Sequence, residues 1–167
     1  TLEEYEKIWR NYLDIDRDYG GIIDIISQNE VLKNAAAENC GIRILRQDKW
    51  ETLCSFIISQ NNNIPRIKVI VERLCENFGE PLQNGGFAFA SAGVIAELEP
   101  EDLAPIRAGF RARYIIDGAR KFLDGTIDLK LIETADIDTA RQELMKITGV
   151  GVKVADCTLL FGFNRID

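Results

Sequence analysis

The chain has 167 residues, of which 46% are hydrophobic and 28% charged, a composition that supports a hydrophobic core and argues against wholesale disorder. The absence of histidine excludes histidine triads and histidine metal sites, and four scattered cysteines without a C-x-x-C pair fit a reduced, intracellular protein without a zinc or iron–sulfur site. No apolar run reaches about 18 residues, which argues against a membrane span, and the net charge of −7 argues at first sight against a nucleic-acid partner.

The first forty residues predict short helices with a packing role. Thr1–Glu4 has the spacing of a capping box, and the apolar residues after it recur at a helical period. Gly20-Gly21 is expected to break this pattern, with two more short helices over residues 22–26 and 31–36. Gly41 is expected to end the last of them, so residues 1–40 are predicted to form an N-terminal helical segment.

An asparagine-rich turn separates the next two predicted helices, over residues 48–58 and 64–78. Asn61, Asn62 and Asn63 are poor helix formers, and each side chain carries both a donor and an acceptor. Arg66 follows about one helical turn later, and residues 61–73 carry three basic side chains against one acidic. One interpretation is a plain turn between helices. The other is that amide and guanidinium groups fill the hole left in a duplex and bond an unpaired base.

A second basic stretch follows an irregular loop over residues 80–93 and short helices over 94–98 and 101–106. After Gly109 a helix is predicted from Phe110, and residues 107–121 carry five basic side chains against one acidic. A basic face can coexist with an acidic body because charges are screened beyond about 10 Å. Phe110 beside Arg111 is either a wedge between base steps or a buried ring whose neighbouring arginines form salt bridges.

Two glycines, Gly149 and Gly151, separate the predicted helix over 138–147 from a final apolar run, after a predicted linker over 125–133. Both glycines can adopt positive φ and allow another backbone to come close. The free N–H groups and positive dipole end of the following helix predict a phosphate site. The alternative is an ordinary helix–glycine–helix turn with a surface lysine at Lys153.

Lys153 is the candidate nucleophile, because it lies in the first turn of that helix. A lysine nucleophile must be partly neutral. The helix start disfavours a nearby positive charge, and Val152 and Val154 add desolvation, so both effects favour the neutral amine. Such an amine could attack a sugar C1′, displace the base and form a Schiff base. The alternative is a solvated lysine or a phosphate contact.

No period-two alternation and no internal repeat is visible, so the fold class is predicted to be all-α with many short helices. The predicted boundaries are 1–40, a helical bundle over 41–148, and 149–167 as the second half of the hairpin and the start of a second lobe.

The stretch Leu144–Leu160 resembles the helix-hairpin-helix motif of DNA base-excision glycosylases. Leu45–Asp48, Ser59–Arg66, Gly109–Tyr114 and Gly149–Cys157 occur in the order found in 8-oxoguanine DNA glycosylases of the eukaryotic type. The resemblance implies two helical lobes with a cleft, without that family's N-terminal sheet domain and C-terminal helices. It implies a monomeric base-excision repair glycosylase with AP lyase activity, acting on double-stranded DNA that contains oxidised guanine, in a prokaryotic cytoplasm or a eukaryotic nucleus and with no membrane partner.

The resemblance also implies roles for individual residues. Lys153 would be the Schiff-base nucleophile, and Cys157 would lie against the flipped base. The implied DNA contacts are Asn61, Asn62, Arg66, Phe110, Arg111, Gly149, Gly151 and Val154. Among them, Asn61 would fill the vacated space, Arg66 and Arg111 would bond the orphaned base, and Phe110 would be the wedge. No cofactor is required, but the carbonyls of Met145, Ile147 and Val150 would hold a structural Na⁺ or K⁺.

Two departures from the family pattern stand out. Thr148 occupies a position where the family usually has proline, which should loosen the turn slightly. The family's essential aspartate would fall beyond Asp167, and neither Asp156 nor Asp167 matches it, so the chain is expected to be an internal segment of a longer enzyme. Two other functions stay open, a non-catalytic helix-hairpin-helix DNA-binding module and a purely structural helical domain.

Overall fold

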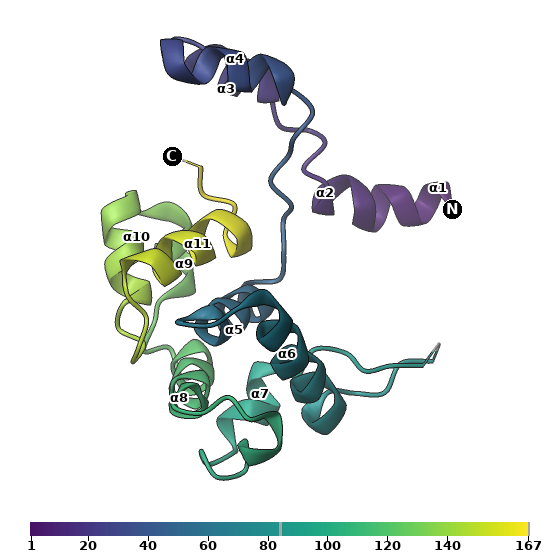
Figure 1. Cartoon of the computed structure of the whole chain (residues 1–167), viewed down its shortest axis with the longest axis vertical. Helices are drawn as coiled ribbons and strands as arrows, with labels where there is room; N and C mark the ends of the chain where they lie inside the picture. Colours follow the sequence, from purple (N-terminus) through teal and green to yellow (C-terminus); the bar gives the residue numbers. More distant parts are fainter. Residues whose placement is uncertain (84, 167) are drawn as a thin grey trace. The chain divides into compact units, whose positions relative to one another are not determined.

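Helices are the regular elements of the computed structural model, which describes residues 1–83 and 85–166 (Figure 1). This confirms the all-α prediction, since β-structure in the described residues is limited to an isolated bridge between Pro81 and Phe87. The chain divides into two units, residues 1–46 and 47–167. None of the described helices is long and apolar enough to cross a membrane.

The first unit contains a continuous helical run and two further helices. They are α1 (Leu2–Glu4), η1 (Tyr5–Trp9), α2 (Arg10–Tyr12), α3 (Tyr19–Ile26) and α4 (Glu30–Glu38). The capping box between Thr1 and Glu4 is confirmed. The predicted break at Gly20-Gly21 is wrong: the Asp18 side chain accepts the Gly21 N–H, and this cap starts α3 ahead of both glycines.

A buried carboxylate is the most enclosed group of the first unit. Asp14 is 2% exposed and accepts hydrogen bonds from Arg17 Nε (2.6 Å), Arg46 Nε (2.7 Å) and the Tyr19 hydroxyl (3.0 Å). Burial by itself raises the pKa of Asp14, but these hydrogen bonds outweigh it and lower the pKa below its usual value. Removal of one of these partners would therefore leave a buried charge without full compensation.

The second unit carries the remaining helices. They are α5 (Lys49–Ser59), α6 (Ile64–Phe78), α7 (Ala92–Ala96), η2 (Ala104–Ile106), α8 (Arg111–Leu123), α9 (Leu129–Thr134), α10 (Ile137–Leu144) and α11 (Val152–Gly162). The linker predicted over 125–133 is wrong in its second half, because the Asp128 side chain accepts the Lys130 and Leu131 N–H groups and caps α9. The predicted domain boundaries after residues 40 and 148 stay predictions.

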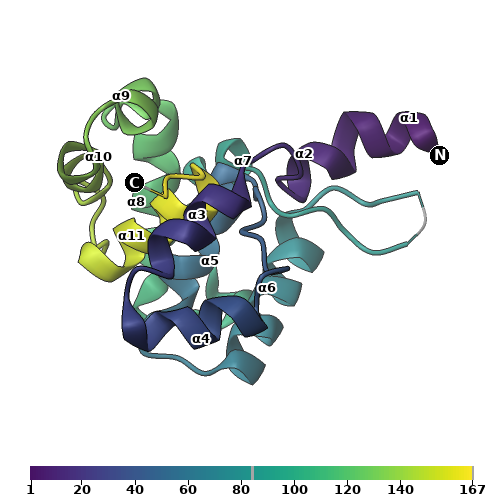
Figure 2. The ribbon, with the colours of Figure 1, turned by 90° about the horizontal axis from the view of Figure 1, so that it is seen from above.

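Helix α5 is central in the second unit and packs against α6, α8 and α11 (Figures 1 and 2). In Figure 1, α9, α10 and α11 gather on one side of α5, and α6 and α7 lie on the other. Gly118 of α8 lies near Ile57 of α5 and Ile147, since a Cβ placed on it would meet Ile57 Cδ1 at 3.4 Å and Ile147 Cγ2 at 3.5 Å, both ordinary contact distances. This side of α8 therefore faces both α5 and the chain segment that precedes α11.

Candidate nucleic-acid interface

The hairpin consists of α10, a turn over residues 145–151, and α11. Gly149 has φ +81°, and a Cβ on it would lie 2.4 Å from Tyr114 Cδ2, so both the backbone and the packing require glycine. Gly151 has φ −100°, and a Cβ there would meet nothing within 4 Å. Only the first glycine therefore uses positive φ, and the space beside the second is open.

The start of α11 presents free backbone donors. Within the described residues, the Gly149 and Gly151 N–H groups have no hydrogen-bond acceptor, and no side chain caps α11. Lys153 is exposed in the first turn and makes no ion pair with another described residue. An anion approaching Gly151 would therefore meet unpaired N–H groups, a helix dipole and a lysine.

The asparagine turn is built by the side chain of Asn62. Its Nδ2 donates to Ile58 O at 3.0 Å, and its Oδ1 accepts from the Asn63 N–H at 3.0 Å. Asn63 in turn caps α6 by accepting the Arg66 N–H. Asn61 has φ +45° and is exposed. Asn62 therefore shapes the turn, whereas Asn61 is presented to solvent, and the DNA roles of both residues stay predictions.

Arg111 joins this turn to the start of α8. The side chain is 2% exposed; its Nε donates to Gln60 O at 2.9 Å and its Nη2 to Gln60 O and, at 2.8 Å, to Asn61 O. Its Nη1 donates to Ala108 O at 3.2 Å, which leaves one Nη1 hydrogen for another acceptor. Burial, followed by the charge of Arg66, lowers the pKa of Arg111. The predicted base contact would use that remaining donor.

Phe110 is exposed, so the alternative of a buried ring is wrong. The side chain is 47% exposed and follows Gly109, whose φ is +64°. Its ring contacts the edge of Tyr114 with centroids 5.7 Å apart, and the Arg111 guanidinium lies 4.4 Å from its centroid. An exposed ring supported from behind by two neighbours fits the predicted wedge.

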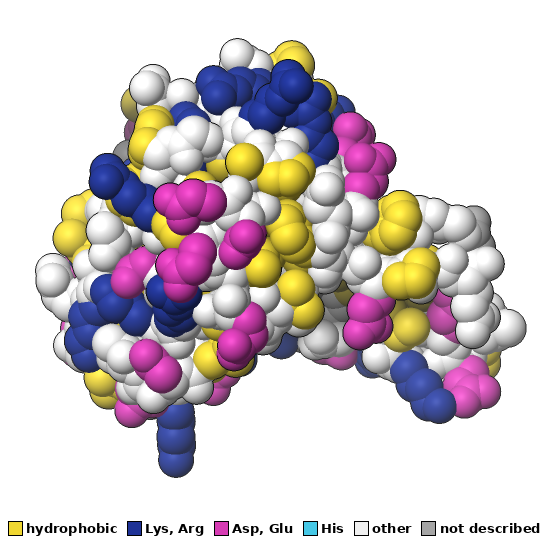
Figure 3. Space-filling model, turned by 90° about the horizontal axis from the view of Figure 1, so that it is seen from below, with side chains coloured by type: hydrophobic (Ala, Val, Ile, Leu, Met, Phe, Trp, Pro, Cys, Tyr) yellow, Lys and Arg dark blue, Asp and Glu magenta, His cyan; other side chains and the backbone are white. Residues whose placement is uncertain are grey.

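The three predicted segments are connected through the first turn of α8. Arg111 holds the asparagine turn, Phe110 lies beside it, and Tyr114 packs under Gly149 of the hairpin. Several exposed cations within or close in sequence to these segments form no ion pair with a described residue. They are Arg66, Lys68, Arg107, Arg113 and Lys153. Figure 3 shows one side of the molecule, on which basic side chains form separate groups with acidic side chains between them, so that side is locally rather than uniformly basic.

The other predicted site residues lie in α11 and in the turn. Val154 is buried, and Cys157 is a half-buried free thiol one helical turn beyond Lys153. Ile147 O accepts the Val150 N–H at 3.0 Å, which leaves a lone pair on that predicted cation ligand. Asp156 accepts from Arg141 Nε at 2.6 Å, which gives it a structural role.

Sequence reasoning missed the residues of α8 that face the hairpin. Tyr114, Asp117 and Lys121 contact the turn, and Gly118 lies beside Ile147 of the same turn. Their helical spacing of three and four residues places them on one face of α8, a signal present in the sequence. The sequence does not show that the hairpin turn packs on this face of α8, however, so the pattern alone predicts an ordinary amphipathic helix.

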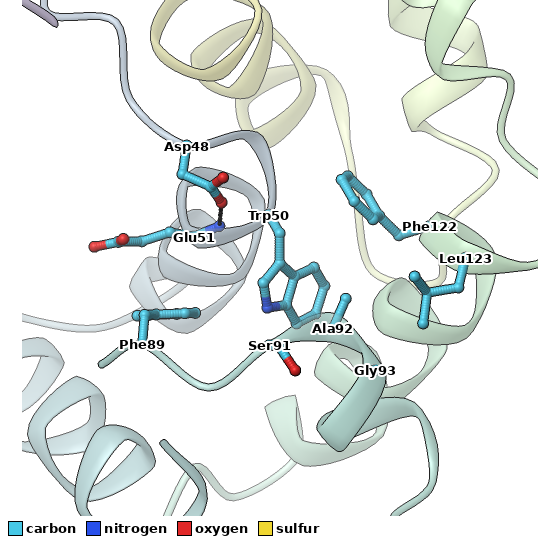
Figure 4. Close-up of a pocket in the computed structure, with 9 residues that line it drawn as sticks. All are labelled: Asp48, Trp50, Glu51, Phe89, Ser91, Ala92, Gly93, Phe122 and Leu123. Atoms are coloured by element: carbon cyan, nitrogen blue, oxygen red, sulfur yellow. Dashed lines mark hydrogen bonds between the residues drawn. The ribbon is translucent and has the colours of Figure 1, made fainter. Parts of the chain in front are cut away.

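A separate hollow of about 420 Å³ lies away from these residues (Figure 4). It is lined by the beginning of α5, the beginning of α7 with the residues before it, and the end of α8; Trp50 lies between the Asp48–Glu51 side and the Phe122 side. Burial and then Asp48 raise the pKa of Glu51 at its edge. None of the predicted DNA-contacting residues lines this hollow.

Comparison with known proteins yields two family matches. The family model described as HhH-GPD superfamily base excision DNA repair protein matches residues 54–164. The model described as 8-oxoguanine DNA glycosylase, N-terminal domain, matches residues 1–53. The described part of that N-terminal match is helical, without a β-strand.

Individual relatives agree with these matches. The Saccharomyces cerevisiae N-glycosylase/DNA lyase is 40% identical over 139 residues, which cover 74% of this chain and 37% of that protein. The apo Clostridium acetobutylicum 8-oxoguanine glycosylase/lyase superposes with a TM-score of 0.90 at 39% identity, covering 98% of this chain and 59% of that one. The same enzyme with double-stranded DNA containing cytosine opposite 8-oxoG gives 0.87 at 38% identity, over 98% of this chain and 58% of that one. The chain thus spans roughly two fifths to three fifths of the length of these relatives.

Proposed function

Because the chain belongs to the 8-oxoguanine DNA glycosylases of the HhH-GPD base excision repair superfamily, we propose that its protein removes 8-oxoguanine from duplex DNA and cleaves the resulting abasic site. The observation that carries this proposal is the row formed by the asparagine turn, Phe110 and the hairpin. The asparagine turn fits the space vacated in the duplex, Phe110 fits between stacked bases, and the hairpin fits the DNA backbone. The substrate is double-stranded DNA with oxidised guanine, and the protein acts as a monomer.

The hairpin supplies the grip on the backbone. The N–H groups of Gly149, Gly151 and Val154 would donate to a phosphate oxygen, which the open space beside Gly151 admits. The wedge and the asparagine turn would offset the cost of flipping the base, a few kcal/mol. Cys157, one turn along α11, would then lie beside the extruded base.

Lys153 performs the covalent step in this proposal. Its neutral Nζ attacks C1′, the bond from C1′ to the base nitrogen breaks, and the base leaves with the electron pair and takes up a proton. Loss of the amine proton and opening of the sugar ring give a Schiff base between Nζ and C1′. Loss of a C2′ proton and of the 3′ phosphate then cleaves the strand by β-elimination.

Lys153→Gln in the full-length protein tests the assignment. We expect the covalent adduct with an 8-oxoguanine duplex, trapped by borohydride, to disappear, because glutamine cannot form an imine. Melting temperature should not change, since Lys153 is exposed and forms no ion pair with a described residue. An undiminished adduct would refute the role of the lysine. Equal affinity for damaged and undamaged duplexes, with no adduct in the wild type, would favour a non-catalytic DNA-binding module instead.

Two further expectations follow from the same proposal. The carbonyls of Met145, Ile147 and Val150 would hold a Na⁺ or K⁺ ion that supports the turn, and Ile147 O retains a lone pair for it. No other cofactor is required. A genomic DNA substrate places the protein inside the cell, in the cytoplasm of a prokaryote or the nucleus of a eukaryote.

A further inference from the structure

Helix α8 holds the hairpin at three points along one of its faces. The Tyr114 ring packs under Gly149, Asp117 Oδ2 accepts the Thr148 N–H at 2.7 Å, and Lys121 Nζ donates to Lys146 O at 2.7 Å. Asp117 and Lys121 also form an ion pair of 3.0 Å, one helical turn apart. The two polar contacts therefore reach the turn on either side of Ile147.

We propose that Asp117 and Lys121 are positioning residues that fix the hairpin amides where they receive a DNA phosphate, an inference that rests on the proposed function. Asp117 holds the N–H of the residue before Gly149, and Lys121 holds a carbonyl two residues earlier. Two bonds from one rigid helix define both the position and the tilt of the peptide planes between them. The free Gly149 and Gly151 donors follow directly after this fixed segment.

The identity of Thr148 explains why this chain uses the contacts from Asp117 and Lys121, which together are called the clamp below. A proline at this position would set φ through its ring and would have no N–H to donate. Thr148 lacks the ring constraint, and its N–H is the group that Asp117 binds. The hydrogen bond therefore opposes the loosening expected from threonine, and the residues at positions 117 and 148 are coupled.

Lys121 makes a carboxylate acceptable close to a phosphate site. Burial alone raises the pKa of Asp117, but bonds from Thr148 and Lys121 outweigh it and lower the pKa, so the group is ionised at neutral pH. An isolated carboxylate here would repel DNA. The Lys121 ammonium at 3.0 Å cancels that charge and at the same time binds Lys146 O.

A double-mutant cycle measures the coupling through duplex affinity and its salt dependence. Asp117→Ala should weaken binding of an 8-oxoguanine duplex about tenfold, as expected for loss of one hydrogen bond to a charged group. The slope of log K against log salt should not fall, because the impaired phosphate contact is made by uncharged amides and Lys121 keeps its charge. Asp117→Asn keeps an oxygen acceptor and should recover most of the affinity. Thr148→Pro in the Asp117→Ala background should restore affinity to within about threefold of wild type, since the ring replaces the lost constraint.

Asp24→Ala is the control, because it removes an exposed carboxylate of α3, outside the unit that carries α8 and the hairpin. Its affinity and salt slope should equal those of the wild type. The proposal is overturned if Asp117→Ala binds like the control, or if Thr148→Pro fails to improve the Asp117→Ala protein.

Amide hydrogen exchange in the free protein separates the clamp from the DNA function. Asp117→Ala should speed exchange of the Thr148 amide, which loses its acceptor, and of the Val150 amide, which bonds Ile147 O in the same turn, about tenfold beyond any change in global stability. If the wild type binds no duplex, the proposed function fails, while exchange still tests whether α8 positions the hairpin. Unchanged exchange at both amides overturns the positioning role.

Discussion

Gly149 and Gly151 occupy one turn, two positions apart, yet the fold requires only one of them. Gly149 combines positive φ with a Tyr114 ring at its Cα, whereas Gly151 has an ordinary φ and empty space beside it. The folded chain gives no steric reason for glycine at position 151. A phosphate approaching the start of α11 would give one, because a Cβ would stand in its path.

A pair of alanine substitutions separates the two roles. Gly149→Ala should lower the free energy of unfolding by about 2–4 kcal/mol, from the left-handed backbone and the clash with Tyr114. Gly151→Ala should cost less than about 1 kcal/mol of stability, as for alanine at a helix start, yet weaken duplex binding. Urea denaturation and fluorescence anisotropy measure the two effects. Equal stability losses in the two variants would contradict this assignment.

Arg111 and Arg113 offer a second matched pair at the residue scale. Arg111 is buried and bonded to three carbonyls, whereas Arg113 is exposed and its guanidinium lies 5.2 Å from the Tyr114 ring centroid. Arg111→Met should destabilise by about 2–4 kcal/mol because buried carbonyls lose their donors. Arg113→Met should cost at most about 1 kcal/mol. Chemical denaturation of both variants measures the two losses of stability. A comparable loss in Arg113→Met would argue against the anchoring role of Arg111.

At the scale of elements, Glu143 ties α10 to the loop that precedes α9. The carboxylate is buried, accepts the Asp128 N–H at 2.8 Å and pairs with Lys146 at 2.6 Å. Burial raises the pKa of Glu143, but Lys146 and the Asp128 amide outweigh it, so the pKa is lowered. A lowered pKa in the folded state means that the group stabilises the fold above its usual value of 4.5 and stops doing so as pH falls through the lowered value.

Glu143→Gln should therefore flatten the acid side of the stability profile. Below pH 4.5 the wild type is expected to lose this part of its stability, whereas the glutamine variant is less stable at neutral pH and depends less on acid. Thermal melts from pH 3 to pH 7, roughly the carboxyl range, test this. Glu101→Gln, at an exposed position, is the control and should follow the wild-type profile. A Glu143→Gln profile parallel to the wild type would count against the assignment.

Local signals predicted most helices, because caps and apolar periods are encoded by neighbours. Asp48 caps α5 and Asn63 caps α6, and both lie where turn chemistry in the sequence puts them. The contacts that assemble the site are long-range. Arg111 binds a carbonyl 51 residues away. Because every residue has a backbone carbonyl, the sequence does not mark which one serves as the acceptor. The sequence does not mark Asp128 as the cap of α9, because the surrounding residues 125–133 have a composition typical of a linker.

At the scale of the whole molecule, the two units differ in how much apolar surface they bury. In residues 1–46 Asp14 is the only buried residue, while Ile25 is 69% and Val31 83% exposed. In the described part of residues 47–167 the core includes Leu53, Ile57 and many other fully enclosed side chains. Hydrophobic burial is the main source of folding free energy, so the second unit should carry most of the stability.

Limited proteolysis should reveal this difference. Trypsin is expected to cut first at basic residues of the first unit, leaving a resistant fragment that begins near residue 47, because opening the second unit requires exposing its core. Mass spectrometry identifies the fragment, and its thermal melt should stay cooperative. First cleavage inside α5 or α8 would contradict the expectation.

Arg111 fastens the asparagine turn through main-chain oxygens of Gln60, Asn61 and Ala108. The attachment is therefore indifferent to which side chains those positions carry. What restricts the side chain at position 61 is instead its own backbone, because a φ of +45° favours asparagine or glycine.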